Sequence, residues 1–121
     1  MTDQTKSIGK TTIAPEVLVT IIKLTTLDEA GVLRLAPTPG KVDAFFKKGV
    51  EEGIRINVEN GVVYVDLHII VENGHNVKDV SRSLQKHVAR AISEMIGMEP
   101  GKVNIHIEDI DYKNSDETNK V

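Results

Sequence analysis

Two acidic residues and two histidines of this sequence have side chains that could together form a metal site. Asp66 and His68 lie two positions apart in one alternating apolar segment, and His106 and Glu108 lie two positions apart in another. Because residues two apart in a strand project from the same face, these groups would meet if the two segments were neighbours in a sheet. Such residues are also usual on the solvated face of an antiparallel sheet, and no metal-binding motif occurs. We favour the solvated-face interpretation and predict no catalytic residue, no metal site and no cofactor.

A row of basic residues is the second notable group: Lys78, Arg82, Lys86 and Arg90, called the basic ridge below. The four-residue spacing places them along one side of a helix. Such a ridge could dock on an acidic protein, an anionic lipid or RNA, although charged rows are also the usual outer surface of amphipathic helices. The net charge of -3 and the pI near 5.8 argue against a general nucleic-acid binder.

The pair Phe45 and Phe46 also allows two interpretations. It either covers the core beneath a Pro-rich loop or offers a hydrophobic contact to another protein. Core covering is favoured because Phe is generally buried. Together with a first helix that is apolar around most of its circumference, the pair nevertheless suggests self-association, and we predict a homo-oligomer.

Length and composition indicate one modest domain. The chain has 121 residues, of which 40% are hydrophobic and 3% aromatic, so Val, Ile and Leu must build the core. The absence of cysteine removes disulfides and Cys-based zinc sites. Residues 1–8 are expected to be a disordered leader without the hydrophobic region of a secretory signal. The most apolar patch, Val17 to Ile22, is far shorter than the roughly 20 residues of a bilayer span. We expect a cytoplasmic protein whose membrane contact, if any, is made through a partner.

The first half of the chain predicts an extended run over Gly9 to Ile13 and a helix from Pro15 to about Glu29, since Pro favours the first helical position. The expected apolar stripe of this helix consists of Val17, Leu18, Ile21, Leu24 and Thr25, with Val19, Ile22 and Leu27 outside it. Gly31 ends the helix, and Val32 to Leu35 predicts a short strand. Lys41 to Glu52 is expected to form a short helix.

The second half has clearer patterns. Ile54 to Val58 alternates, and Asn60-Gly61 supplies the two positive-φ positions of a tight hairpin turn. In the return strand, one face is expected in the core: Val63, Val65, Leu67, Ile69 and Val71. Asn76 is the expected N-cap of a helix over Val77 to Ile96, whose stripe is Val77, Val80, Leu84, Val88, Ala91, Ile92 and Met95. Gly97 ends this helix, and a last strand includes Val103, Ile105 and Ile107.

These elements predict an α+β fold with the order β-α-β-β-β-α-β. Both amphipathic helices are expected on one face of a mainly antiparallel sheet, and the strand order stays open. We expect a single domain over residues 9–110 and a disordered polar tail over residues 111–121.

Several short segments form an ordered series along the chain: Gly9 followed by Ile13 to Val17, Gly31-Val32, Gly53 to Ile56, Val65 to Val71 with Gly74, and Gly97 before Val103 to Ile107. Their order and spacing together resemble the alkaline shock protein 23 family of bacteria. The resemblance covers about 100 residues. The sequence departs from the family pattern between Arg34 and Glu52, where Pro37-Thr38-Pro39 and the Phe pair replace a Gly-rich connection.

The resemblance implies a non-enzymatic cytoplasmic protein of general or cell-envelope stress, in some members held at the membrane by a partner with its own transmembrane segment. The first hypothesis is therefore a scaffold or adaptor that self-associates or binds envelope-linked proteins through the first helix, Phe45 and Phe46, or the basic ridge. The alternative is an RNA-binding module, against which stand the acidic balance and the scarcity of aromatic residues. An enzyme would require a metal at Asp66, His68, His106 and Glu108.

Overall fold

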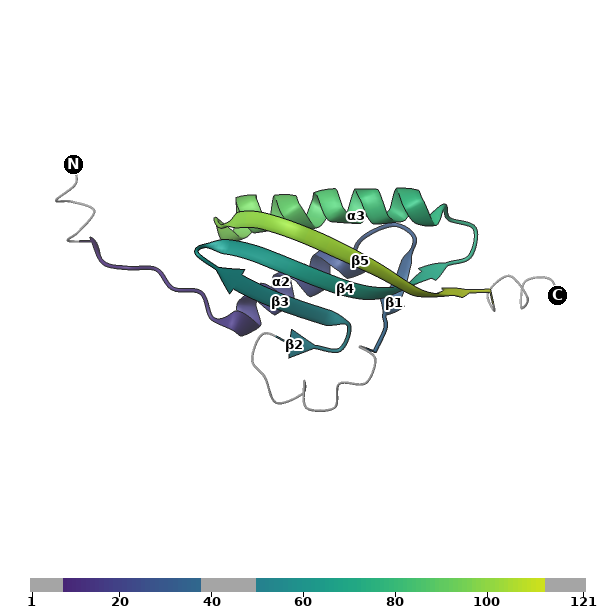
Figure 1. Ribbon diagram of the computed structural model, residues 1–121, viewed down its shortest axis with the longest axis horizontal. Helices are drawn as coiled ribbons and strands as arrows, with labels where there is room; N and C mark the ends of the chain where they lie inside the picture. Colours follow the sequence, from purple (N-terminus) through teal and green to yellow (C-terminus); the bar gives the residue numbers. More distant parts are fainter. Residues whose placement is uncertain (1–7, 38–49, 113–121) are drawn as a thin grey trace.

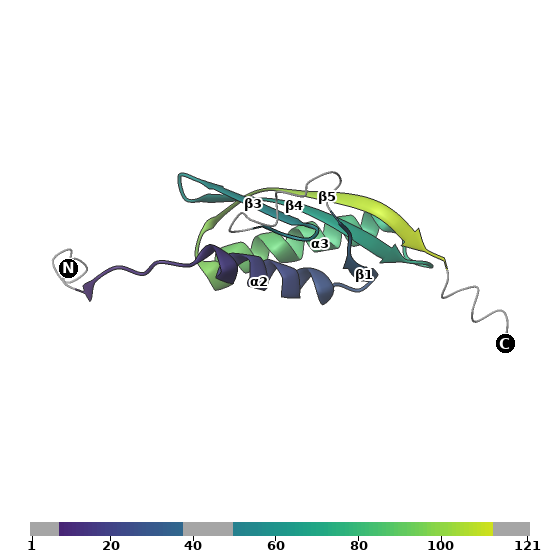
Figure 2. The same ribbon diagram turned by 90° about the horizontal axis from the view of Figure 1, so that it is seen from below.

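The protein forms one sheet covered on a single face by two helices (Figures 1 and 2). The computed structural model describes residues 8–37 and 50–112. In chain order the elements are α2 (Pro15–Leu27), β1 (Val32–Leu35), β2 (Val50–Glu51), β3 (Ile54–Glu59), β4 (Val62–Glu72), α3 (Val77–Ala91), the π-helix η2 (Ile92–Ile96) and β5 (Glu99–Asp111). The predicted α+β class and the placement of both helices on one face are confirmed.

β4 is the central strand of the sheet. β3 pairs with its first part, from Val62 to Leu67, and β1 pairs with its last part, from Ile69 to Val71, so both occupy the same edge of β4. β2 extends the sheet beyond β3. These three pairings are antiparallel, as predicted.

β5 lies along the other edge of β4 and is parallel to it over almost its whole length. A parallel neighbour follows from the connection, because the crossover through α3 returns the chain to the end of the sheet at which β4 began. The contact between β4 and β5 is the most extensive one between any two described elements. The outer face of the sheet is therefore built mainly from two long parallel strands, whose register shifts at two points.

The extended run predicted over Gly9 to Ile13 is not a strand. One edge of β4 is shared by β1 and β3, and β5 occupies the other, so this run has no partner on β4. In Figure 1 it leads away from the sheet. The observed order of described elements thus begins with a helix.

Turn geometry explains how β1 and β3 share one edge. Asn60 and Gly61 have φ of 52° and 78°, the positive values expected for the tight turn between β3 and β4. Gly53 lies where the start of β3 meets the end of β1, and its carbonyl accepts from the His68 amide. A Cβ at Gly53 would lie 2.6 Å from the carbonyl oxygen of Ala36. Only glycine lets the backbones approach this closely.

The core lies between the sheet and the two helices. The inward face of β4 is fully buried and consists of Val63, Val65, Leu67, Ile69 and Val71, as predicted. It packs against Leu18, Val19 and Ile22 of α2, Val80, Leu84 and Val88 of α3, and Ile92 and Ile96 of η2.

The buried side of α2 differs from the predicted stripe. Val19 and Ile22 are buried, whereas Val17 and Leu24 are exposed. The spacing gave no unique answer because apolar residues surround most of this helix, and contact with α3 and the sheet selected another sector. Leu27 is exposed as well, which confirms that one sheet face cannot cover all of the apolar surface. The helix ends at Leu27 and not at Glu29.

The C-terminal end of the second helix also differs by one residue. α3 begins as predicted, with the Asn76 side chain accepting a hydrogen bond from the Asp79 amide. η2 then replaces the last α-helical turns, and a π-helix spaces its hydrogen bonds over one more residue. Consequently Ile96 is 7% exposed and Met95 is 68% exposed, whereas a regular α-helix would have placed Met95 in the stripe. Gly97 ends the helix with φ of 78°, as predicted.

Some predictions fall outside the described residues. These are the disordered state of residues 1–7 and 113–121, the proline-rich segment from residue 38 onward, and the positions of Phe45 and Phe46. The predicted tail starts too early, because Asp111 is the last residue of β5. The short helix expected over Lys41 to Glu52 is wrong at its end, because Val50–Glu51 forms β2 against the start of β3.

Candidate functional site

The four acidic and histidine residues on the outer sheet face do meet. The parallel register pairs Asp66 with Asn104 and His68 with His106. His68 Nδ1 lies 2.6 Å from Glu108 Oε2, and His106 Nε2 lies 3.2 Å from Asp66 Oδ1. The two imidazole rings stack with their centroids 4.5 Å apart and an interplanar angle of 15°. Asn104 Nδ2 donates to the same oxygen of Asp66.

This outer-face cluster is arranged in pairs and not around a common centre. Each histidine contacts its own carboxylate, His68 that of Glu108 and His106 that of Asp66. No group of three or more His, Asp or Glu within the described residues has the geometry to hold a metal ion. The arrangement is that of cross-strand pairs which stabilise the contact between β4 and β5.

A second polar cluster, which sequence reasoning missed, joins the two helices. Glu29 follows the end of α2, and its carboxylate accepts a hydrogen bond from Ser83 Oγ at 2.7 Å and lies 2.6 Å from His87 Nδ1. The Glu29 side chain is 6% exposed, although His87 itself is half-exposed. Ser83 and His87 are one turn apart on α3 and so face the same neighbour. That spacing was visible in the sequence, but nothing identified Glu29 as the partner.

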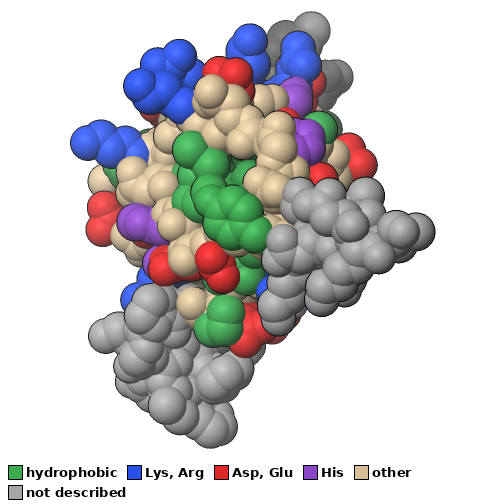
Figure 3. Space-filling view, turned by 90° about the vertical axis from the view of Figure 1, so that its right-hand side faces the viewer, with side chains coloured by type: hydrophobic (Ala, Val, Ile, Leu, Met, Phe, Trp, Pro, Cys, Tyr) green, Lys and Arg blue, Asp and Glu red, His purple; other side chains and the backbone are tan. Residues whose placement is uncertain are grey.

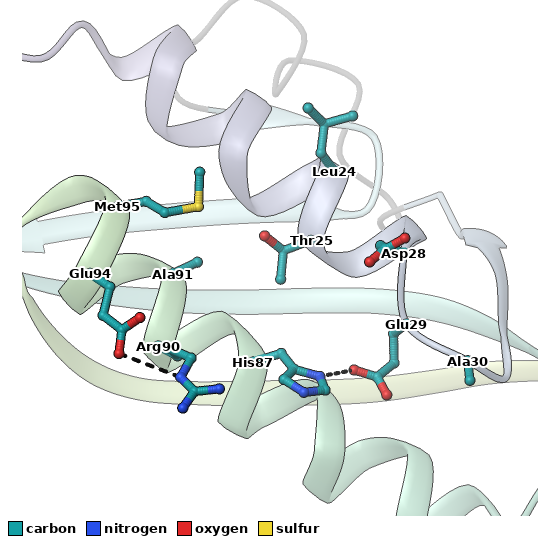
Figure 4. A pocket seen from close by; sticks show the side chains of 10 residues that line it. All are labelled: Leu24, Thr25, Asp28, Glu29, Ala30, His87, Arg90, Ala91, Glu94 and Met95. Carbon is teal, nitrogen blue, oxygen red and sulfur yellow. Dashed lines mark hydrogen bonds and ion pairs between the residues drawn. The ribbon is translucent and has the colours of Figure 1, made fainter.

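Beside this cluster, a groove of about 720 Å³ runs between α2 and the end of α3 (Figure 4). Leu24, Thr25, Ala91 and Met95 form its less polar part, and Asp28 and Glu94 lie toward its rim. The Glu94 carboxylate pairs with Arg90 Nε at 3.4 Å. Because its acidic groups already have basic or hydroxyl partners or lie at the rim, the groove offers mainly apolar contact.

All four residues of the basic ridge are exposed on α3, as their spacing predicted. Arg90 contacts Glu94, whereas no salt bridge between described residues engages Lys78, Arg82 or Lys86. Figure 3 shows lysine and arginine side chains gathered toward the top of the molecule, the side on which α3 lies, above a hydrophobic patch with acidic side chains around it. The ridge is thus presented outward.

Comparison with known proteins identifies the group to which this fold and sequence belong. The model of the alkaline shock protein 23 family, which is described as having a cell envelope-related function, matches residues 3–112. The chain belongs to this family. The match extends through both helices and all strands of the sheet, so the family's characteristic pattern is the α+β unit described above and not one short motif.

Two known proteins are similar to this chain over nearly the same region. The uncharacterized protein Spy1535 of Streptococcus pyogenes is 33% identical over 107 residues, which span 88% of this chain and 82% of the relative. The uncharacterized protein YqhY of Bacillus subtilis is 25% identical over 107 residues, which span 87% of this chain and 79% of the relative. Among solved structures, a MamM CTD variant superimposes with a TM-score of 0.48 at 15% identity, covering 78% of this chain and 95% of the other.

Among the described residues, no helix has both the length and the apolar character needed to cross a bilayer.

Proposed function

We propose that this protein is a non-enzymatic, stress-associated scaffold or adaptor that self-associates and binds envelope-linked protein partners. It would act on the cytoplasmic side, with any membrane association made through such a partner. The family description supports the envelope link. The surfaces proposed for binding are those whose side chains are not already paired within the fold.

The observation that supports the proposal most strongly is the contrast between paired and exposed groups. On the outer sheet face, Asp66 and Glu108 are paired with His106 and His68, and between the helices Glu29 is held by α3. These contacts are within the fold and stabilise it. The basic ridge and the outer side of α2, in contrast, present charged and apolar side chains to solvent, as surfaces for macromolecular contact do.

The basic ridge is the surface that we propose for the envelope-linked partner. Lys78, Arg82 and Lys86 lie about 6 Å apart along α3, since each residue adds about 1.5 Å of rise, and they form an extended positive row. An acidic segment of a partner protein would complement this row, and attraction between the two would increase the rate of association. Phe45 and Phe46 stay a second proposed contact, outside the described residues.

The test is a matched charge reversal. Lys78, Arg82 and Lys86 are changed to Glu in one variant, and the exposed Lys10, Arg34 and Lys102 are changed to Glu in the control, so that both variants have the same net charge. Proteins cross-linked to each form in native cells are then identified. We expect the ridge variant to recover at least about tenfold less envelope-linked partner protein than the wild-type chain. The control should recover as much as the wild-type chain.

Equal recovery of partners by the two variants would remove the ridge from the proposal. Recovery of RNA in place of protein, with binding that weakens steeply as salt rises, would favour the RNA-binding alternative. All six positions are exposed, so both variants should keep the fold. Circular dichroism of the two variants checks this.

A further inference from the structure

The outer side of α2 has an unusual density of exposed apolar residues. Leu24 is 61% exposed, Val17 46% and Leu27 41%, and Ile13, just before the helix, is 37% exposed. The sheet and α3 cover the opposite side of α2, where Leu18, Val19, Ile22 and Thr26 are buried. Figure 2 shows α2 at the surface of the helical layer, on the side away from the sheet.

The exposed residues follow one line along the helix. Val17, Thr20, Leu24 and Leu27 are separated by three, four and three residues, the spacing of the contact positions in paired helices. We call these four residues the α2 seam. Met95 of η2, which is 68% exposed, lies across the groove from Leu24 and widens the apolar surface (Figure 4).

The middle of the seam is nearly symmetric about Thr20. Within the helix, apolar residues occur three positions before Thr20, at Val17, and four positions after it, at Leu24, with Leu27 one turn further on. A helix with this pattern matches itself when a second copy is turned end to end. Such pairing is the isologous contact of a twofold dimer.

Thr20 suits the centre of this contact. Its hydroxyl already donates a hydrogen bond to the Glu16 carbonyl oxygen at 2.8 Å, so covering the residue leaves no donor without a partner. The side chain is also short, which allows two helices to approach closely at the crossing point.

The charges beside the seam are complementary in the same arrangement. Glu16 and Lys23 lie on one flank of α2, two turns apart. When the second helix is reversed about Thr20, Glu16 of each copy faces Lys23 of the other. A parallel twofold pair would instead place this flank beside the opposite flank of the other helix, where neither Glu16 nor Lys23 lies. The charges therefore favour the antiparallel orientation.

We propose that the α2 seam is the docking site for a second copy of this chain, with two α2 helices packed antiparallel about a twofold axis near Thr20. The inference rests on the self-association part of the proposed function and specifies its surface and partner. α2 is about 20 Å long, so the contact is small. It gives a weak dimer, with a dissociation constant in the micromolar range.

Sedimentation equilibrium of the full chain over roughly 1–300 μM tests the dimer. Leu24→Glu places a charge in each half of the seam and should raise the dimer dissociation constant at least about tenfold. The control is Val58→Glu on β3, because Val58 is an exposed apolar residue outside the seam. A dimer that survives Leu24→Glu, or a wild-type chain that stays monomeric over the whole range, overturns the inference.

Two further variants test the orientation. Glu16→Lys and Lys23→Glu should each weaken the dimer several-fold, and the double exchange should restore it, since the attraction between copies is then re-established with reversed signs. In one chain these residues are two turns apart, so rescue reports contact between copies. Failure of the double exchange to restore the dimer would contradict the antiparallel arrangement.

The absence of native cysteine allows a direct geometric check. Thr20→Cys places one thiol from each copy near the twofold axis, and mild oxidation should produce a covalent dimer much faster than Glu59→Cys, a control at an exposed hairpin position. Equal rates for the two variants would count against the seam. These outcomes are independent of the basic ridge, because loss of envelope-linked partners in the ridge variant leaves the dimer intact if both proposals hold.

Discussion

At the scale of single residues, one carboxylate fastens the two helices together. Glu29 receives a hydrogen bond from Ser83 and lies against His87 while its own side chain is almost completely buried. A buried carboxylate loses contact with water, and the loss is offset only when hydrogen bonds replace that contact. The cluster therefore stabilises one relative position of α2 and α3.

Removing this carboxylate should be measurable. Glu29→Ala leaves Ser83 and His87 without their partner and should lower the free energy of unfolding by roughly 1–3 kcal/mol. Glu94→Ala is the control, because the Arg90–Glu94 pair is exposed on both sides and should change stability by less than about 1 kcal/mol. Urea denaturation of both variants gives the comparison. Similar losses would show that the Glu29 cluster has no special role in stability.

At the scale of elements, η2 decides which residue completes the core at the end of the second helix. Because the π-helical turn inserts one residue relative to an α-helix, Ile96 packs against the core while Met95 faces outward. The same shift brings Met95 to the groove beside α2. One local irregularity thus affects both the core and a surface that we propose for self-association.

The shift predicts unequal costs for two neighbouring truncations. Ile96→Ala removes buried methyl groups and should destabilise the protein by about 2–4 kcal/mol, whereas Met95→Ala should change stability by less than about 0.5 kcal/mol. Denaturant unfolding at low protein concentration, where the chain is monomeric, separates these effects from dimer formation. The reverse ranking would mean that the helix continues as a regular α-helix.

At the scale of the whole molecule, the two proposed surfaces lie on different helices. The α2 seam lies on one and the basic ridge on the other, so a dimer formed through α2 leaves the ridge of each copy available. A self-paired unit would then present two ridges to envelope-linked partners. Two linked binding sites raise the overall affinity when the partner is also multivalent.

Dimer formation should make thermal stability depend on protein concentration. Because association stabilises the folded state by mass action, the Tm of the wild-type chain should rise by several degrees between roughly 5 and 500 μM. The Tm of Leu24→Glu should rise clearly less over that range, because its dimer dissociates more readily. Differential scanning calorimetry provides the measurement, and a wild-type Tm that does not change with concentration would contradict the seam.

Much of the fold follows from local patterns. The Asn60-Gly61 turn, the Asn76 cap, the Gly97 terminator and the alternating face of β4 are each set by residues close together in sequence. Backbone preferences and side-chain periodicity act over that range. The exposure of the basic ridge could be predicted for the same reason, since the strong amphipathic pattern of α3 leaves only one side to bury.

The tertiary structure decided the remaining features because they depend on contacts between distant segments. Periodicity places residues around α2, but when apolar residues occupy most of the circumference it does not specify which sector is covered, and packing against α3 and the sheet left Val17 and Leu24 outside. The pairing of Asp66 with His106 required β5 to lie parallel to β4. The partner of Glu29, on an element more than 50 residues away, was likewise determined by the fold, since sequence distance contains no information about which surfaces meet.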